Sequence, residues 1–168
     1  MKIAIIYSTS SRSTKKACEL LSSKINATVQ LIPIEKAKTE CILNYNFIIL
    51  ASSAYKGKVQ SALKRYISRN IKTLMEKPVG LVINCEENID TIDRLNKTFT
   101  KELVDSSYIS SNFGYELNRD EGNFLEKRKI NNMIDEYKKD GKSLPMLNLN
   151  EIDNFADYIN NMIEKRVD

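Results

Sequence analysis

Histidine is absent from this 168-residue chain, and cysteine, proline and glycine are scarce. Without histidine the chain cannot build a Ser-His-Asp triad, an HExxH zinc site or a histidine general base. The three cysteines, Cys18, Cys41 and Cys85, are odd in number and far apart, which excludes a disulfide framework and a CxxC metal knuckle. We therefore expect no metal site, and we expect a bound cofactor to carry the chemistry.

The sequence also lacks the segments that place a protein in or across a membrane. No apolar run approaches the roughly 20 residues that a membrane-spanning helix needs. The N-terminus begins with a strand-like pattern and has none of the zones of a signal peptide. We expect a cytoplasmic protein in which residues 1–168 form a single domain, with no transmembrane segment.

The charge is slightly basic, with 26 lysines and arginines against 22 aspartates and glutamates, a formal net charge of +4. The two signs are interleaved along the chain, which is typical of a solvated mixed surface. A basic surface is also suited to an anionic partner, and this alternative stays open. We expect no nucleic-acid partner.

Apolar runs separated by helical patterns indicate the fold class. Helical spacing of apolar residues fills the intervals between five predicted strands, and this alternation is typical of βαβ units with a mainly parallel sheet covered on both faces. The predicted strands are Ile3–Tyr7, Ala27–Ile32, Phe47–Ala51, Val79–Ile83 and Ser107–Leu117.

Ligands of open parallel sheets bind beyond the carboxyl ends of the strands. Three polar loops are predicted at that edge: Ser8–Ser13, Ser52–Lys58 and Asn84–Asn88. The first loop places several hydroxyls before a helix N-terminus, where backbone amides and the helix dipole attract an anion. Serine and threonine are also common caps and turn formers, so hydroxyl density alone leaves both interpretations open.

Several nucleotide-binding and phosphate-transfer classes are excluded. The chain has neither GxxxxGK[ST] nor GxGxxG, which removes the P-loop and dinucleotide-binding fingerprints. The first strand ends without paired acids, which argues against a phosphoacceptor receiver domain.

The stretch Tyr7–Thr14 resembles the phosphate loop of flavodoxins, commonly T/S-x-T-G-x-T. Thr9, Ser11 and Thr14 fall on the hydroxyl positions, and Arg12 stands where the family has glycine. A residue other than glycine there must avoid a positive φ or accept strain. The arginine also offers a side chain that can extend to a phosphate.

Two further stretches support the resemblance. Residues Asn44–Lys58 resemble the family's D-Y-D-x-(apolar)-G-S-P-I-Y-x-G-K segment, with matches at Tyr55, Gly57 and Lys58. Residues Phe113–Asn118 resemble the F-G-G-x-L-D/N stretch of a branch that includes the menaquinone-dependent protoporphyrinogen oxidases.

The resemblance implies a flavodoxin-like three-layer α/β sandwich, with a five-stranded parallel sheet in the order 2-1-3-4-5, and FMN as the cofactor. The phosphate would lie on the first loop and the flavin ring between the other two. Tyr55 is the natural ring neighbour, although a tyrosine that packs against its own loop is an alternative. The cofactor-binding residues implied are Thr9, Ser10, Ser11, Arg12, Ser13, Thr14, Ser52, Ser53, Ala54, Tyr55, Lys56, Gly57, Asn84, Cys85 and Glu86.

The leading hypothesis for function is therefore electron transfer through FMN, between a redox partner protein or small-molecule donor and an acceptor. One version is a carrier. The other is a protoporphyrinogen oxidase-like enzyme that uses porphyrinogen and a quinone. Because Arg12 and the third loop depart from the family, a flavin-free interaction module is a third alternative. Cys85 is interpreted as a packing residue in preference to a reactive thiol, and no catalytic residue is assigned.

Overall fold

The computed structural model describes residues 1–9, 12–37, 42–54, 61–86, 90–119 and 124–165. Five parallel strands form one sheet in the order β2-β1-β3-β4-β5, which confirms the predicted fold class and strand order. The strands are β1 (Lys2–Ser8), β2 (Thr28–Pro33), β3 (Phe47–Ser53), β4 (Val79–Asn84) and β5 (Ile109–Asn112).

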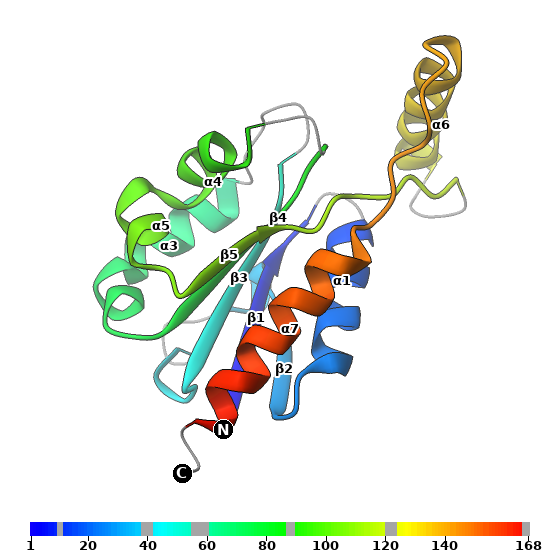
Figure 1. Cartoon of the computed structure of the whole chain (residues 1–168). Coiled ribbons are helices and arrows are strands. Elements are labelled where there is room, and N and C mark those ends of the chain that lie inside the picture. The colour runs from blue at the N-terminus through cyan, green and yellow to red at the C-terminus, as the bar shows by residue number, and fades with distance from the viewer. Residues whose placement is uncertain (10–11, 38–41, 55–60, 87–89, 120–123, 166–168) are drawn as a thin grey trace.

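Helices cover both faces of the sheet, as Figure 1 shows. On one face lie α1 and α7, and on the other lie α3, α4 and α5. The sixth helix, α6, covers neither face. The bounds are α1 (Arg12–Lys24), the short 3-10 helix η1 (Ile34–Lys36), α3 (Ser61–Met75), α4 (Thr91–Phe99), α5 (Lys101–Ser106), α6 (Phe124–Lys139) and α7 (Leu149–Glu164).

The continuous apolar runs form strands that are buried on both sides. Strands β3 and β4 are buried throughout, and β1 is buried after Lys2. Because side chains alternate across a sheet, Ile48 faces the core under α3 to α5, whereas Phe47 and Ile49 face the core under α1 and α7. Two apolar cores of this kind are what a three-layer sandwich requires.

Gly80 in β4 shows how closely α7 packs on the sheet. A Cβ at this position would lie 2.9 Å from Cζ of Phe155 and 3.2 Å from Cε1 of Phe47. The same Phe155 ring meets Phe113 edge to face, with 5.4 Å between ring centroids. The missing side chain thus makes room for the aromatic contacts that fix α7 beside β5.

The fifth strand is much shorter than predicted. The sequence suggested Ser107–Leu117, but β5 ends at Asn112. Gly114 has a left-handed φ of 64° and forms an isolated antiparallel bridge with Leu147. The chain therefore turns away from the sheet two residues after β5. There, Gly114 pairs with Leu147, which lies just before α7.

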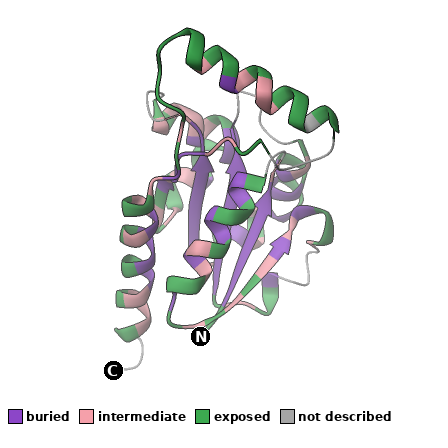
Figure 2. Cartoon of the chain, turned by 90° about the vertical axis from the view of Figure 1, so that its right-hand side faces the viewer, coloured by how far each residue is buried: buried purple, intermediate pink, exposed green. Residues whose placement is uncertain are grey.

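Residues 113–148, which we term the β5–α7 segment, carry α6 beyond the carboxyl ends of the strands (Figure 1). Figure 2 shows α6 lying across that end of the molecule, with mostly exposed residues. Among the α6 residues whose burial is described, Ile134 alone is buried. In the described part of the chain, no helix has the length and apolar character needed to cross a membrane.

Candidate functional site

The carboxyl ends of the three central strands meet at one edge, as the sequence predicted. The register pairs Ser8 of β1 with Ser52 of β3, and Ser53 of β3 with Asn84 of β4. Strand order reverses around β1, which makes this edge the switch point where open α/β sheets bind ligands. Of the predicted site residues, five lie outside the described residues: Ser10, Ser11, Tyr55, Lys56 and Gly57.

The phosphate side of the predicted site is the N-terminal turn of α1. This turn carries no acidic side chain, so nothing in it opposes the positive end of the helix dipole. Arg12 is exposed and, within the described residues, its guanidinium has no ion pair. Thr14 is fully buried, and its Oγ1 has no hydrogen-bond partner in that same part of the chain.

An unpaired buried hydroxyl costs about 1–3 kcal/mol. A ligand oxygen at this helix end would remove that cost for Thr14, because a hydroxyl donates to a phosphate oxygen without adding charge. The first turn of α1 therefore fits an anionic group.

Ser13 has a structural partner that the sequence did not reveal. Its Oγ accepts a hydrogen bond from the backbone N–H of Glu116 at 3.0 Å. Lys16 holds the carboxylate of the same Glu116, at 2.7 Å from Oε1 and 2.9 Å from Oε2. The chain after β5 is thus fastened to the helix end that is predicted to bind phosphate, with the Ser13 hydroxyl oxygen as the acceptor.

The ring side of the predicted site begins where β3 and β4 end. Ser52, Ser53 and Ala54 are all buried. The Ser52 hydroxyl donates to the carbonyl of Ser53 at 3.2 Å, and the Ala54 N–H donates to the carbonyl of Asn84 at 3.1 Å. One side-chain contact and one backbone contact therefore fix the end of β3, and residues 55–60 lie outside the described part.

Two asparagines connect the end of β4 to the end of β5. Asn84 donates from Nδ2 to the carbonyl of Gly114 at 2.8 Å. Asn112 accepts from the backbone N–H groups of Cys85 at 3.2 Å and of Gly114 at 3.0 Å. Asn84 Oδ1 is buried without a partner in the described residues. The asparagines fix the backbone path of the third loop.

Cys85 is a packing residue, in agreement with the preferred interpretation of the sequence. It is 1% exposed, and burial raises the pKa of its thiol to about 11, although Arg94 acts in the opposite direction. The thiolate is the nucleophilic form of cysteine. A thiol that stays protonated near neutral pH offers no activated nucleophile at this edge.

Three oxygen atoms converge beside Cys85 in a way that the sequence did not predict. The hydroxyls of Tyr115 and Tyr137 lie 2.8 Å apart, and each lies 3.3 Å from Oε1 of Glu86. Burial, and then the hydrogen bond with Tyr137, raise the pKa of Tyr115. The cluster joins the end of β4, the chain after β5 and the last turns of α6.

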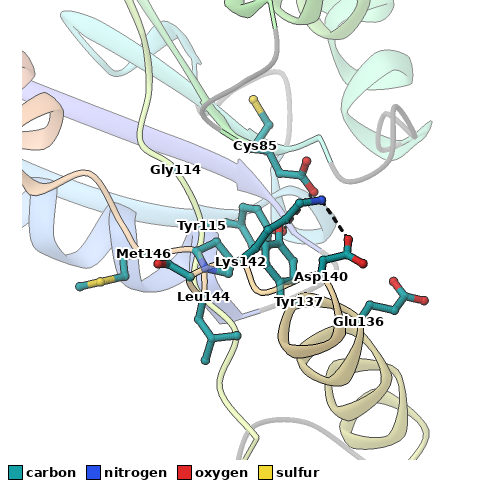
Figure 3. Close-up of a pocket in the computed structure, with 12 residues that line it drawn as sticks. Cys85, Gly114, Tyr115, Glu136, Tyr137, Asp140, Lys142, Leu144 and Met146 are labelled. Atoms are coloured by element: carbon teal, nitrogen blue, oxygen red, sulfur yellow. Dashed lines mark hydrogen bonds and ion pairs between the residues drawn. The ribbon is translucent and has the colours of Figure 1, made fainter.

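A cavity of about 680 Å³ surrounds this cluster (Figure 3). It shares Cys85 and Glu86 with the predicted ring site, and the β5–α7 segment supplies the rest of its wall. The lining residues are Cys85, Glu86, Gly114, Tyr115, Glu136, Tyr137, Asp140, Lys142, Ser143, Leu144, Pro145 and Met146.

A family model described as "Flavodoxin domain" matches residues 4–143, which is well over half of the chain. This chain belongs to the flavodoxin-domain family. No curated protein matches its sequence.

Solved flavodoxins resemble this flavodoxin-domain chain in fold. Reduced Megasphaera elsdenii flavodoxin has a TM-score of 0.54 and 15% identity, over 67% of this chain and 82% of its own. A flavodoxin from the domain Archaea has a TM-score of 0.51 and 15% identity, over 83% of this chain and 98% of its own. A short-chain flavodoxin associated with a non-canonical PDU bacterial microcompartment has a TM-score of 0.53 and 11% identity, over 80% of this chain and 95% of its own.

The flavodoxin-domain architecture accounts for the three predicted loops, but the sequence did not predict the residues that organise them. Asn112, Tyr137 and the ammonium of Lys16 meet their partners across 22 to 100 positions of sequence. A local pattern carries no signal for such contacts. Glu116 and Tyr115 lie inside the Phe113–Asn118 resemblance, which was the one signal that pointed to them.

Proposed function

We propose that this protein binds FMN at the carboxyl edge of its sheet and transfers electrons through it. The observation that carries the proposal is the buried hydroxyl of Thr14, which has no hydrogen-bond partner among the described residues and lies in a helix turn without acidic side chains. Membership of the flavodoxin-domain family and the switch-point geometry support the same edge.

In this proposal, the chain's own residues bind and orient the cofactor. Thr9, Ser10, Ser11, Arg12, Ser13 and Thr14 would hold the phosphate; Ser52–Gly57 and Asn84–Glu86 would enclose the ring. When bound, FMN accepts one or two electrons, so the protein mainly positions it and sets its potential. No acid–base side chain is essential to the protein's part. The electrons come from, and pass to, a redox partner protein or a small molecule.

A protoporphyrinogen oxidase-like enzyme is a second candidate, with a quinone as acceptor. Its support is the Phe113–Asn118 stretch, in which Gly114 and Glu116 make specific backbone and side-chain contacts. The net charge of +4 is also suited to a substrate with carboxylates. A flavin-free interaction module is the third candidate, because Arg12 and the third loop depart from the family pattern.

The proposal is tested by loading the purified chain with FMN and with riboflavin, which lacks the phosphate. We expect a yellow complex with FMN and a weaker one with riboflavin. An anaerobic assay with protoporphyrinogen and a menaquinone analogue then separates the enzyme from the carrier. Turnover supports the enzyme, whereas reversible reduction by a reductase without turnover supports the carrier. A chain that takes up no FMN rejects both and leaves the interaction module.

A further inference from the structure

The cavity between the ends of β4 and β5 and the β5–α7 segment is separate from the turn that fits phosphate. Its volume of about 680 Å³ lies in the range of small-molecule sites in proteins. No residue of the first turn of α1 lines it, among the residues that the structure describes. The wall belongs instead to the chain after β4 and after β5, and to the last turns of α6.

The charge of this wall is opposite to that of the chain. Among the described residues, three carboxylates line it, from Glu86, Glu136 and Asp140, against the single ammonium of Lys142. Three negative charges and one positive charge give −2, whereas the whole chain carries +4. A concave surface with one dominant sign concentrates ligands of the opposite sign.

The one ammonium is already engaged. Lys142 Nζ lies 2.9 Å from Oδ2 of Asp140. Glu86, in contrast, has no ion pair in the described part of the chain, and its Oε1 faces the two phenol hydroxyls. A cation in the cavity would therefore add a favourable charge contact for Glu86 without displacing an existing partner.

The carboxylates are spread along the wall rather than focused on one point. No group of three or more His, Cys, Asp or Glu side chains that could hold a metal ion occurs among the described residues. Two phenol rings, Tyr115 and Tyr137, lie between the acidic side and an apolar side formed by Leu144 and Met146 (Figure 3). Aromatic rings attract organic cations through their electron-rich faces.

We propose that this cavity binds a small, flat organic cation, with its charge toward Glu86 and its uncharged part against Leu144 and Met146. The site goes beyond the proposed flavin site: it shares Cys85 and Glu86 with that site, and residues of the β5–α7 segment form the rest of its wall. A ligand that occupied it would lie next to Cys85 and Glu86, at the edge of the proposed ring site.

The test uses three ligands that share one ring and differ in charge: 1-methylnicotinamide (cation), nicotinamide (neutral) and nicotinate (anion). Each is titrated into the full chain while the backbone amide signals of Cys85, Gly114 and Tyr115 are followed by NMR. We expect saturable shifts at these amides with affinity in the order cation, neutral, anion. Equal affinity for the three ligands, or shifts concentrated elsewhere, overturns the proposal.

Charge-removing variants sharpen the result. We expect Glu86→Gln to lower the affinity for the cation roughly fivefold to tenfold while leaving the affinity for nicotinamide unchanged. Glu136→Gln, at an exposed position, should weaken the cation in the same direction, which keeps the test valid if the first variant folds poorly. Asp157→Asn on the exposed side of α7 is the matched control and should change nothing. If neither cavity variant lowers the affinity for the cation, the proposed site is wrong.

The same titration is run with and without FMN, so that failure of either proposal is distinguishable. Binding of the cation to a chain that takes up no FMN supports the cavity and rejects the flavin. Uptake of FMN without binding of the cation rejects the cavity alone. Competition between FMN and the cation also overturns the proposal, because the cavity would then belong to the flavin.

Discussion

Lys16 and Glu116 form an ion pair that links the first helix to the chain after the last strand, with Nζ 2.7 Å from Oε1. The pair lies beside the turn where we propose that phosphate binds, since the backbone N–H of Glu116 donates to Ser13. The ammonium therefore neutralises a carboxylate that would otherwise repel a phosphate.

Removing the ammonium of Lys16 should weaken the binding of FMN. We expect Lys16→Met to lower FMN affinity severalfold at low salt, and less at high salt, because salt screens the repulsion between the half-buried Glu116 carboxylate and the phosphate. Adding Glu116→Gln should restore most of the affinity. Fluorescence titration at two salt concentrations measures both effects.

The control is Lys24→Met, which breaks the 2.6 Å pair with Asp153 at the far end of α1 and should leave FMN affinity unchanged. Equal losses for the two lysine variants would contradict the account.

Arg12 should distinguish FMN from riboflavin. Its exposed guanidinium stands at the first residue of α1, where the family pattern has glycine. We expect Arg12→Ala to weaken FMN binding by about 1 kcal/mol, roughly fivefold in affinity, as for an exposed charge contact. Riboflavin binding should stay unchanged. Isothermal titration with the two ligands measures the difference. An equal loss for riboflavin would mean that Arg12 acts on the loop rather than on the phosphate.

Gly114 should tolerate no side chain. A Cβ there would lie 2.6 Å from the carbonyl oxygen of Met146, and φ is 64°. Gly141 has a similar φ of 63° but nothing within 4 Å of its Cβ position. We expect Gly141→Ala to cost about 1–2 kcal/mol from backbone strain, and Gly114→Ala to cost about 1–3 kcal/mol more from overpacking. Urea unfolding measures both, and equal costs would show that the bridge to Leu147 adapts easily.

Cys85 should be alkylated slowly near neutral pH. Burial raises the pKa of this thiol from 9.0 to about 11, so its reactive thiolate forms only as pH approaches 11. The raised value also means that its contribution to stability is fully present below about pH 9 and is lost as pH rises toward 11. Mass spectrometry of iodoacetamide labelling at Cys85 between pH 7 and 10.5 follows the first effect. A rate that reaches its plateau below pH 9 would contradict the assignment.

The sequence predicted the sheet well because its central strands are continuous apolar runs. Phe47–Ala51 and Val79–Ile83 are short apolar runs bounded by polar residues, which favours buried strands, and the apolar spacing between them favours a helix. The fifth strand was predicted too long because Ser107–Leu117 mixes polar and apolar residues without a clear end. Its end is decided by Gly114, whose φ depends on the distant backbone of Met146 and Leu147.

The candidate site was predictable only where it follows from strand ends and local loops. The positions of Thr14 and Asn84 follow directly from the topology. The cluster of Glu86, Tyr115 and Tyr137 does not, since its members lie 22 to 51 positions apart and meet only when α6 crosses the sheet edge. The residues Phe124–Tyr137 are typical of a helix, but their pattern carries no information about where that helix lies.

The central claim, that the first turn of α1 holds the phosphate of FMN, is tested most directly by Thr14→Ala. The matched control is Thr98→Ala on α4, because Thr98 is also buried and its Oγ1 also lacks a partner among the described residues. FMN binding is measured by quenching of flavin fluorescence. We expect Thr14→Ala to weaken FMN by about 1.5–3 kcal/mol, roughly tenfold to hundredfold, with riboflavin unchanged, and Thr98→Ala to have no effect on either ligand. Unchanged FMN affinity in Thr14→Ala would contradict the claim and place the phosphate elsewhere.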